Sequence, residues 1–308
     1  MKSITTSSAR AYRACNRLFQ FKYVLGYKPV KTGEALRRGS LTHLGLNAWW
    51  LKPDLDEMLD VVAAQEADEY DLALCQEMLR GYHFRWIDTV PDHEVLDVEQ
   101  EFDIPIINPD TGYPMRGIRL RGKVDVRCTK KIVEHKTTTL DISAGSNFWR
   151  KLSIDTQVSN YMLGTGVDTC LYDVLRTPTL RRLKATPVEN RKYKADGTLY
   201  KKQREHDETA DEYRMRVREA IAEDPDKYYR RGTIVRHEKE ITEAQYDLFQ
   251  QAQLIKESER TGRWPRNPET CFMYSTECAF FDVCSGVESL DNRVRFRKKK
   301  SIHEELSK

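Results

Sequence analysis

Two acidic residues and a lysine that could support metal-assisted chemistry lie in one short stretch of the chain, GKVDVRCTKKIVEHKTTT. Side chains alternate along a strand, so Glu134 and Lys136 are expected on the same face. A two-residue turn at Thr129 and Lys130 would place Asp125 directly opposite Glu134, with Cβ atoms about 5 Å apart on that face. The stretch therefore predicts a hairpin on which two carboxylates and one ammonium group meet.

Two carboxylates this close repel each other unless a cation lies between them. A hard divalent ion such as Mg²⁺ or Mn²⁺ prefers oxygen ligands, and it could bind a phosphate oxygen and lower the pKa of a bound water. Lys136 could then stabilise the developing charge. An exposed cross-strand salt-bridge cluster is the commoner explanation of such a spacing, so the hairpin alone leaves both possibilities open.

The hairpin resembles the signature of the PD-(D/E)xK nuclease superfamily, with Asp125, Glu134 and Lys136 at the named positions and Val124 in place of the nominal proline. The resemblance implies an α/β core with a mixed central sheet, flanking helices and helical additions at both ends. It also implies that Asp125, Glu134 and the backbone carbonyl of Val133 bind Mg²⁺ or Mn²⁺.

Two further motifs occur in the order typical of the RecB-like branch of this superfamily. Gly39-x-x-x-His43 resembles the first motif of that branch, whose histidine is a metal ligand. Gln157-x-x-x-Tyr161 resembles its QxxxY motif, and the i, i+4 spacing puts both side chains on one helical face. The resemblance implies that Gln157 and Tyr161 help to hold the DNA strand and the active site. Neither motif means much alone, but all of them in order favour a nuclease.

The chain has seven cysteines, an odd number that argues against a disulfide framework. Cys271, Cys278 and Cys284 lie close together, and Cys15 lies near the N-terminus; four thiolates suit zinc or a [4Fe–4S] cluster. Ordinary reduced thiols are the third possibility. YRACNRLFQFKYVLG and CAFFDVC resemble the iron–sulfur branch of RecB-like nucleases, which includes AddB-type and CRISPR-associated members. That resemblance implies a structural [4Fe–4S] cluster on these four cysteines, although the gap from Cys271 to Cys278 is wider than usual.

The net charge is only +3, but Lys and Arg gather at 176–204 and 293–300. Such tracts suit a polyanion, although a solvated surface explains them too. We expect Arg181, Arg182 and Lys184 to contact DNA, together with Gln157 and Tyr161. Aromatic side chains that could stack on bases, although core packing is their commoner fate, are Trp49, Trp50, Phe148 and Trp149.

Periodicity and breaker residues predict the elements of the fold. Helices are expected at 7–24 with a cap at Ser7 or Ser8, at 40–51 with Ser40 as cap, and at 153–166, 207–231 and 242–260, and one or two further helices are expected within 55–89. Strands are expected at 93–106, 115–127, 131–139 and 168–178. We expect one nuclease domain over 1–290, with a helical part at 1–92, the catalytic core at 93–178, a basic and helical insertion at 179–240 and a cysteine segment at 241–290. A basic, disordered tail is expected at 291–308.

Several classes of protein are disfavoured. No apolar run approaches the roughly 18 residues of a membrane span, and the N-terminus has no signal-peptide pattern, so we expect a cytoplasmic protein. No Walker A sequence occurs, so ATP is not expected as a partner. LYDVLRTPTLRR and the basic tract resemble stand-alone phage-encoded nucleases, which implies a DNA exonuclease acting on ends or single strands. The alternatives are a structure- or sequence-specific endonuclease and a DNA-binding accessory protein with secondary nuclease activity.

Overall fold

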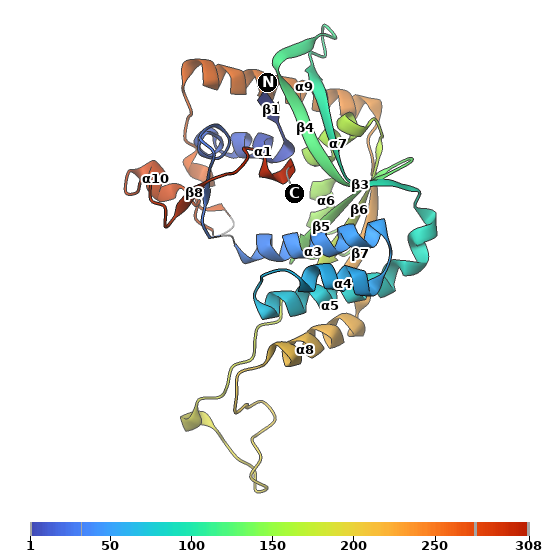
Figure 1. Cartoon of the computed structure of the whole chain (residues 1–308), viewed down its shortest axis with the longest axis vertical. Helices are drawn as coiled ribbons and strands as arrows, with labels where there is room; N and C mark the ends of the chain where they lie inside the picture. The colour runs from blue at the N-terminus through green and yellow to red at the C-terminus, as the bar shows by residue number, and fades with distance from the viewer. Residues whose placement is uncertain (1, 32, 274–275, 307–308) are drawn as a thin grey trace.

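A mixed six-stranded sheet forms the centre of the computed structural model, which describes residues 2–31, 33–273 and 276–306 (Figure 1). The strand order is β1-β4-β5-β6-β7, and β3 pairs with β4 off this path. The strands are β1 (Lys2–Ile4), β3 (Val95–Ile107), β4 (Pro114–Cys128), β5 (Ile132–Thr138), β6 (Thr169–Arg176) and β7 (Tyr229–Val235).

The sheet forks beside β4. One edge of β4 pairs antiparallel with β3 over most of its length. The other edge is shared, because β1 pairs in parallel with residues 118–120 and β5 pairs antiparallel with Val126 and Arg127. Asp125 lies immediately before the point where β5 joins, so the fork exposes this part of β4 to a third element.

Helices cover the sheet on both sides (Figure 1). The α-helices among the described residues are α1 (Thr6–Ala14), α2 (Asn16–Phe19), α3 (Glu34–Leu51), α4 (Leu55–Ala63), α5 (Glu69–Trp86), α6 (Asn147–Leu152), α7 (Thr156–Thr165), α8 (Ala210–Glu223), α9 (Glu238–Thr261) and α10 (Phe281–Ser285). Side chains alternate along β6, so successive residues face the helices on opposite sides of the sheet. Leu171 and Leu175 belong to the apolar cluster under α3, α5 and α8, whereas Tyr172 and Val174 belong to the cluster with α7.

The predicted catalytic hairpin is confirmed, including its register. Val126 pairs with Val133 and Arg127 with Ile132, so the turn falls at 129–130 as expected. The helix predicted between Ser153 and the glycine pair is α7, which begins at Thr156 with Asp155 as its N-cap. The predicted strand at 168–178 is β6, and the helix expected at 242–260 is α9.

Two predictions for the N-terminal helices are wrong in detail. The helix expected at 7–24 is interrupted at Cys15, which has an extended backbone with φ −163° and ψ 118°, and a π-helix follows at Gln20–Val24. Its cap is Thr5, whose side chain accepts the N–H of Ser8. The helix expected from Ser40 begins at Glu34, so Ser40 lies inside α3 rather than at its cap.

Two features of the C-terminal half also differ from expectation. The helix expected at 207–231 ends at Glu223, before a Pro225 turn, and β7 follows it. The tail was expected to be disordered, but its described part, 291–306, is folded. Strand β8 (Phe296–Lys298) pairs antiparallel with β2 (Tyr27–Pro29), and Phe296 is buried. A 3₁₀ turn at Glu304–Leu306 then reaches the active-site side of α1.

Within the described ranges, every helix is too short or too polar to cross a bilayer.

Candidate active site

The predicted acidic residues meet where the sheet forks. The backbone N–H of His135 donates to Oδ2 of Asp125 at 2.7 Å, which ties β5 to β4 beyond their last ladder pair. Glu134 and Lys136 share a face of β5, and the Lys136 ammonium group forms an ion pair with Oε1 of Glu134. Val133, the predicted donor of a backbone carbonyl, lies between β4 and β6 with its side chain fully buried.

Helices α3 and α7 complete the site. His43 of α3 has its Nδ1 atom 3.7 Å from Oδ1 of Asp125. Gln157 of α7 accepts a hydrogen bond from Lys136 at 2.9 Å and donates one to Oε1 of Glu134 at 2.7 Å. The same amide nitrogen lies 2.9 Å from the Tyr161 hydroxyl. All the motif residues predicted for catalysis therefore come together from four separate elements.

Burial makes the charges of this site costly. It raises the pKa of Asp125 to about 6, against the opposing effect of Lys136. It raises the pKa of Glu134 to about 7, and the negative charge of Asp125 adds to that rise. Burial alone would lower the pKa of Lys136, but the carboxylates outweigh it and raise this pKa. Two ionised carboxylates in this position require a compensating cation.

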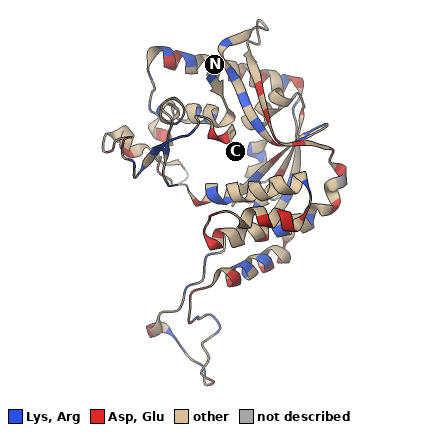
Figure 2. Cartoon of the chain, viewed as in Figure 1, with Lys and Arg blue, Asp and Glu red and all other residues tan. Residues whose placement is uncertain are grey.

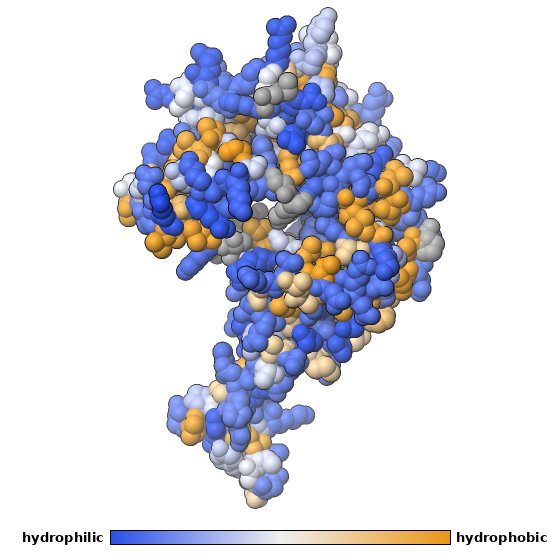
Figure 3. Space-filling model, in the orientation of Figure 1, coloured by the Kyte–Doolittle hydropathy of each residue, from blue (hydrophilic) through white to orange (hydrophobic). Residues whose placement is uncertain are grey.

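The donor set fits a hard divalent ion. Oε2 of Glu134 is buried and has no hydrogen-bond partner among the described residues. Glu134, Asp125 and His43 all line a cavity of about 710 Å³. The space-filling view shows an opening above α3 (Figure 3). Within 2–31, 33–273 and 276–306, however, no group of three or more His, Cys, Asp or Glu has the arrangement of a ready metal site.

Sequence reasoning missed a third carboxylate in this cavity. Glu99 of β3 has φ 59°, an uncommon backbone conformation for a residue with a side chain. Its neighbours Val98 and Gln100 pair with Val126 and Val124, which brings Glu99 beside Asp125. Glu99 accepts a hydrogen bond from Asn47 of α3 at 3.0 Å and forms an ion pair with Lys123. Only the register of β3 on β4 could have revealed it.

The opposite face of β5 supports the site from behind. His135 is fully buried, and burial lowers its pKa well below the usual value, so the ring is neutral. It packs edge-to-face against His43 at a ring distance of 5.9 Å. Beside it, Asp173 accepts hydrogen bonds from Tyr82 and Arg231. This buried network fixes the wall against which His43 rests.

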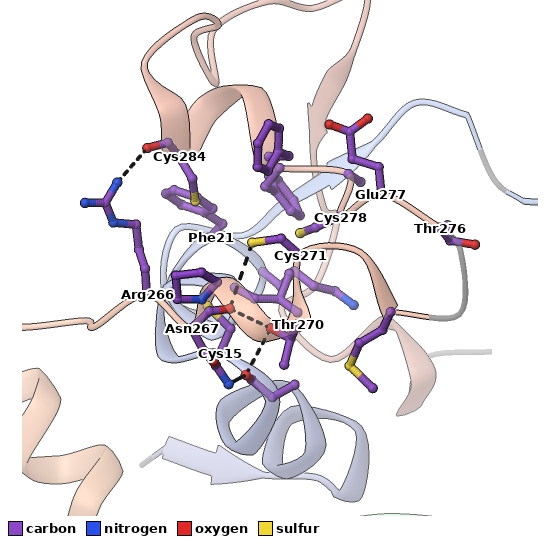
Figure 4. Close-up of a pocket in the computed structure, with 18 of the residues that line it drawn as sticks. Cys15, Phe21, Arg266, Asn267, Thr270, Cys271, Thr276, Glu277, Cys278 and Cys284 are labelled. Atoms are coloured by element: carbon purple, nitrogen blue, oxygen red, sulfur yellow. Dashed lines mark hydrogen bonds between the residues drawn. The ribbon is translucent and has the colours of Figure 1, made fainter.

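The four predicted cluster cysteines line a second cavity, of about 920 Å³ (Figure 4). Cys15 reaches it because the helix breaks at that residue. Cys278 donates its backbone N–H to the carbonyl of Cys271 at 2.7 Å, and burial raises the pKa of Cys278 and of Cys284. The remaining cysteines are Cys75, Cys128 and Cys170, which are buried elsewhere.

The predicted DNA-contacting cations lie away from the catalytic cavity. Arg182 and Lys184 form ion pairs with Asp68 and Asp207, and Arg181 stands next to them on the segment after β6. The aromatic candidates are used for packing. Trp49 and Trp50 are core residues, and Phe148 and Trp149 pack against the cluster beneath α7.

Comparison with known proteins identifies the family. The family model of the PD-(D/E)XK nuclease superfamily matches residues 3–285. The chain belongs to this superfamily. The predictions of a PD-(D/E)XK fold and of a nuclease enzyme are thereby confirmed, and members of the superfamily use divalent metals such as Mg²⁺ and Mn²⁺. No curated protein matches the sequence of this nuclease.

One solved structure with a TM-score above 0.5 supports the same fold at low sequence identity, and two others are similar to this chain with lower scores. A candidate exonuclease from Eubacterium rectale is 12% identical with a TM-score of 0.52, and the match covers 98% of this chain and 92% of that one. A phage-related exonuclease from Haemophilus somnus is 12% identical with a TM-score of 0.36, over 85% of this chain and 96% of the other. An alkaline exonuclease from Laribacter hongkongensis is 14% identical with a TM-score of 0.28, over 74% and 96%.

Proposed function

We propose that this nuclease is a divalent-metal-dependent DNA exonuclease that hydrolyses phosphodiester bonds at DNA ends or in single strands. The observation that carries the proposal is the meeting of Asp125, Glu134 and Lys136 at the fork of the sheet. The buried carboxylates need a cation, and their surroundings supply polar groups for a phosphate. The accompanying motifs around His43 and Gln157 favour end processing over sequence-specific cleavage.

In this proposal Asp125, Glu134, the Val133 carbonyl and His43 hold Mg²⁺ or Mn²⁺. Bound there, the ion supplies Lewis acidity and a water of lowered pKa. The lone buried Oε2 of Glu134 supports its role as a ligand, since it lacks any other partner among the described residues. The contact between His43 and His135 holds the His43 ring in position toward Asp125.

The other side chains act on the phosphate. Lys136 exchanges its contact with Glu134 for one with the attacking oxygen or a non-bridging phosphate oxygen, where its positive charge stabilises the developing negative charge. The side-chain amide of Gln157 forms hydrogen bonds with both Lys136 and Glu134, and these bonds fix the distance between the two charged groups. Tyr161 supports Gln157 and faces the same cavity as a strand contact.

Labelled linear and circular DNA test the proposal. With Mn²⁺ we expect mononucleotides or short products from linear single strands and no cleavage of circular ones. Discrete linear fragments from supercoiled plasmid would show an endonuclease instead. Glu134→Ala should abolish hydrolysis while DNA binding in EDTA persists, and Glu101→Ala, an exposed acid of the same sheet, serves as the matched control. Full cleavage by Glu134→Ala would show that the site assignment is wrong.

We also propose that Cys15, Cys271, Cys278 and Cys284 bind a [4Fe–4S] cluster. The support is that one N-terminal and three C-terminal thiols line a single cavity. A hydrogen bond from the Thr270 hydroxyl to the Ala14 carbonyl, at 3.2 Å, joins the two segments beside it. The cluster would be structural, because hydrolysis transfers no electron.

Iron and acid-labile sulfide in anaerobically purified protein test the cluster. About four irons per chain and an absorbance band near 400 nm are expected for it. Zinc in place of iron would contradict the cluster and leave the nuclease proposal standing.

We further propose that the enzyme needs no ATP and acts in the cytoplasm, in phage-type DNA recombination, replication or degradation.

A further inference from the structure

The chain between β6 and α8 forms an arm, residues 179–208, that leaves the body of the molecule beyond α5 and α8 (Figure 1). Apart from a 3₁₀ turn at Val188–Asn190 it has no regular secondary structure. Loops of this length are uncommon in a compact domain, and ordered ones usually serve a function. Hydrophilic side chains cover most of its surface (Figure 3).

The base of the arm is firmly built. Leu183 donates its N–H to the Glu208 carboxylate, and Glu208 returns its own N–H to the Leu183 carbonyl, both at 2.9 Å. Glu208 is only 2% exposed and forms an ion pair with Arg216. The Arg182 guanidinium lies 3.8 Å from the centre of the Tyr70 ring, whose hydroxyl donates to the Glu208 carbonyl. These contacts fix the direction in which the arm projects.

The tip of the arm, residues 188–204, folds on itself as a small hairpin. Tyr193 bridges Leu199 in an antiparallel pair, and the N–H of Lys194 donates to the Thr198 carbonyl at 2.8 Å. Gly197 adopts φ 79°, which this turn requires. Tyr193 and Tyr200, one on each side of the turn, are both 53% exposed and join none of the apolar clusters among the described residues.

The tip is strongly basic (Figure 2). It has six basic and two acidic residues, a net charge of +4, whereas the whole chain carries +3. The cations at the base are used in ion pairs, as Arg182 and Lys184 show. In contrast, four ammonium groups of the tip have no ion-pair or hydrogen-bond partner within the described ranges. They belong to Lys192, Lys194, Lys201 and Lys202.

We propose that the tip of the arm binds single-stranded DNA, with its lysines on phosphates and Tyr193 and Tyr200 stacked on bases. Lysines interleaved with exposed aromatic rings are the combination that single strands require, because every base offers a face for stacking. A second tip carries the same +4 charge and would be repelled. The inference rests on the proposed function for its choice of nucleic acid, and it adds a contact surface outside the catalytic cavity.

Fluorescence anisotropy with a labelled oligothymidine of about 30 nucleotides tests this surface. All variants in this assay also carry Glu134→Ala, so that the oligonucleotide is not cleaved during the measurement. The first variant has Lys192, Lys194, Lys201 and Lys202 all changed to Gln. Its binding at 0.1 M salt should weaken about tenfold or more, and the plot of log association constant against log salt should become shallower, its negative slope decreasing in magnitude by roughly 3. With all four changed to Arg, affinity and slope should stay near those of the parent.

The tyrosines give the sharper outcome. Tyr193→Leu with Tyr200→Leu should weaken single-strand binding about thirtyfold or more without changing the salt slope, and should leave blunt duplex binding unaffected. Equal weakening on duplex would overturn the single-strand assignment. Parental affinity in both the Gln and Leu variants would overturn the inference, as would a dimer in size-exclusion chromatography that the Leu variant abolishes.

The proposed nuclease function and the proposed DNA-binding role of the arm can be tested independently of each other. Cleavage of a tetranucleotide in Mn²⁺, by arm variants with Glu134 intact, should proceed at the parental rate because so short a substrate does not need a second contact surface. If the parent chain cleaves neither tetranucleotide nor long DNA, the proposed function fails. If it cleaves both, and the variants bind long single strands as the parent does, only the inference about the arm fails.

Discussion

Replacing Glu134 by Gln should make the metal-free protein more stable at alkaline pH. The Glu134 side chain is 3% exposed, and burial together with Asp125 raises its pKa from 4.5 to about 7. A folded state with the higher pKa binds more protons than the unfolded chain, so stability falls as pH rises between about 4.5 and 7. One pKa unit corresponds to about 1.4 kcal/mol, so the ionised carboxylate costs about 3 kcal/mol at pH 8.

Gln has the shape of the neutral acid and removes this cost. In EDTA at pH 8, Glu134→Gln should therefore raise the free energy of unfolding by about 3 kcal/mol, which corresponds to roughly 5 °C in Tm for a chain of this size. The gain should vanish near pH 4, where the wild-type carboxyl is protonated in both states. Glu219→Gln, an exposed position of α8, should change Tm by less than about 1 °C. An unchanged or lower Tm for Glu134→Gln at pH 8 would show that burial does not penalise the ionised Glu134 carboxylate.

Three further predictions concern the same two cavities. Lys136→Met should lower kcat for DNA hydrolysis by about two orders of magnitude or more, while the Kd for DNA in Ca²⁺ stays within about twofold, as binding and single-turnover assays would show; retained kcat would remove Lys136 from the chemistry. Glu99→Gln should weaken Mn²⁺ binding by roughly three- to tenfold, because one negative charge leaves the surroundings of Asp125; calorimetric titration would show it, and unaltered affinity would exclude this electrostatic role. Cys278→Ala should lose its iron and unfold at a lower temperature, whereas Cys75→Ala should keep its iron; equal iron in both would contradict the proposed cluster.

The catalytic hairpin could be predicted from sequence because its information is local. Alternation places Glu134 and Lys136 on one face, and the turn after Cys128 sets the register that brings Asp125 to them. The spacing of Gln157 and Tyr161 is likewise a property of one helix. His43 could be expected at the site only from the order of the motifs, because nothing local links α3 to β4.

Features that depend on distant contacts were missed. Strand β1 is three residues long, and it becomes a strand because residues 118–120 of β4 offer it an edge. The break at Cys15 interrupts a good helical pattern because the Arg17 N–H donates to the Pro265 carbonyl, some 250 residues away. Glu99 reaches the cavity through a positive φ that no sequence pattern indicates. The basic sequence of the tail does not indicate a folded segment. The tail folds because Phe296 packs against Phe21 and Phe280.

The most direct test of the account is the rate of hydrolysis of linear single-stranded DNA as Mn²⁺ is titrated, for the wild-type chain and for Asp125→Asn. We expect the wild-type rate to rise to saturation with Mn²⁺, and we expect the rate of the variant to be lower by about three orders of magnitude or more at every metal concentration. A wild-type rate independent of metal, or a variant with the wild-type rate, would contradict the claim that the buried carboxylates at the fork of the sheet form a metal-dependent nuclease site.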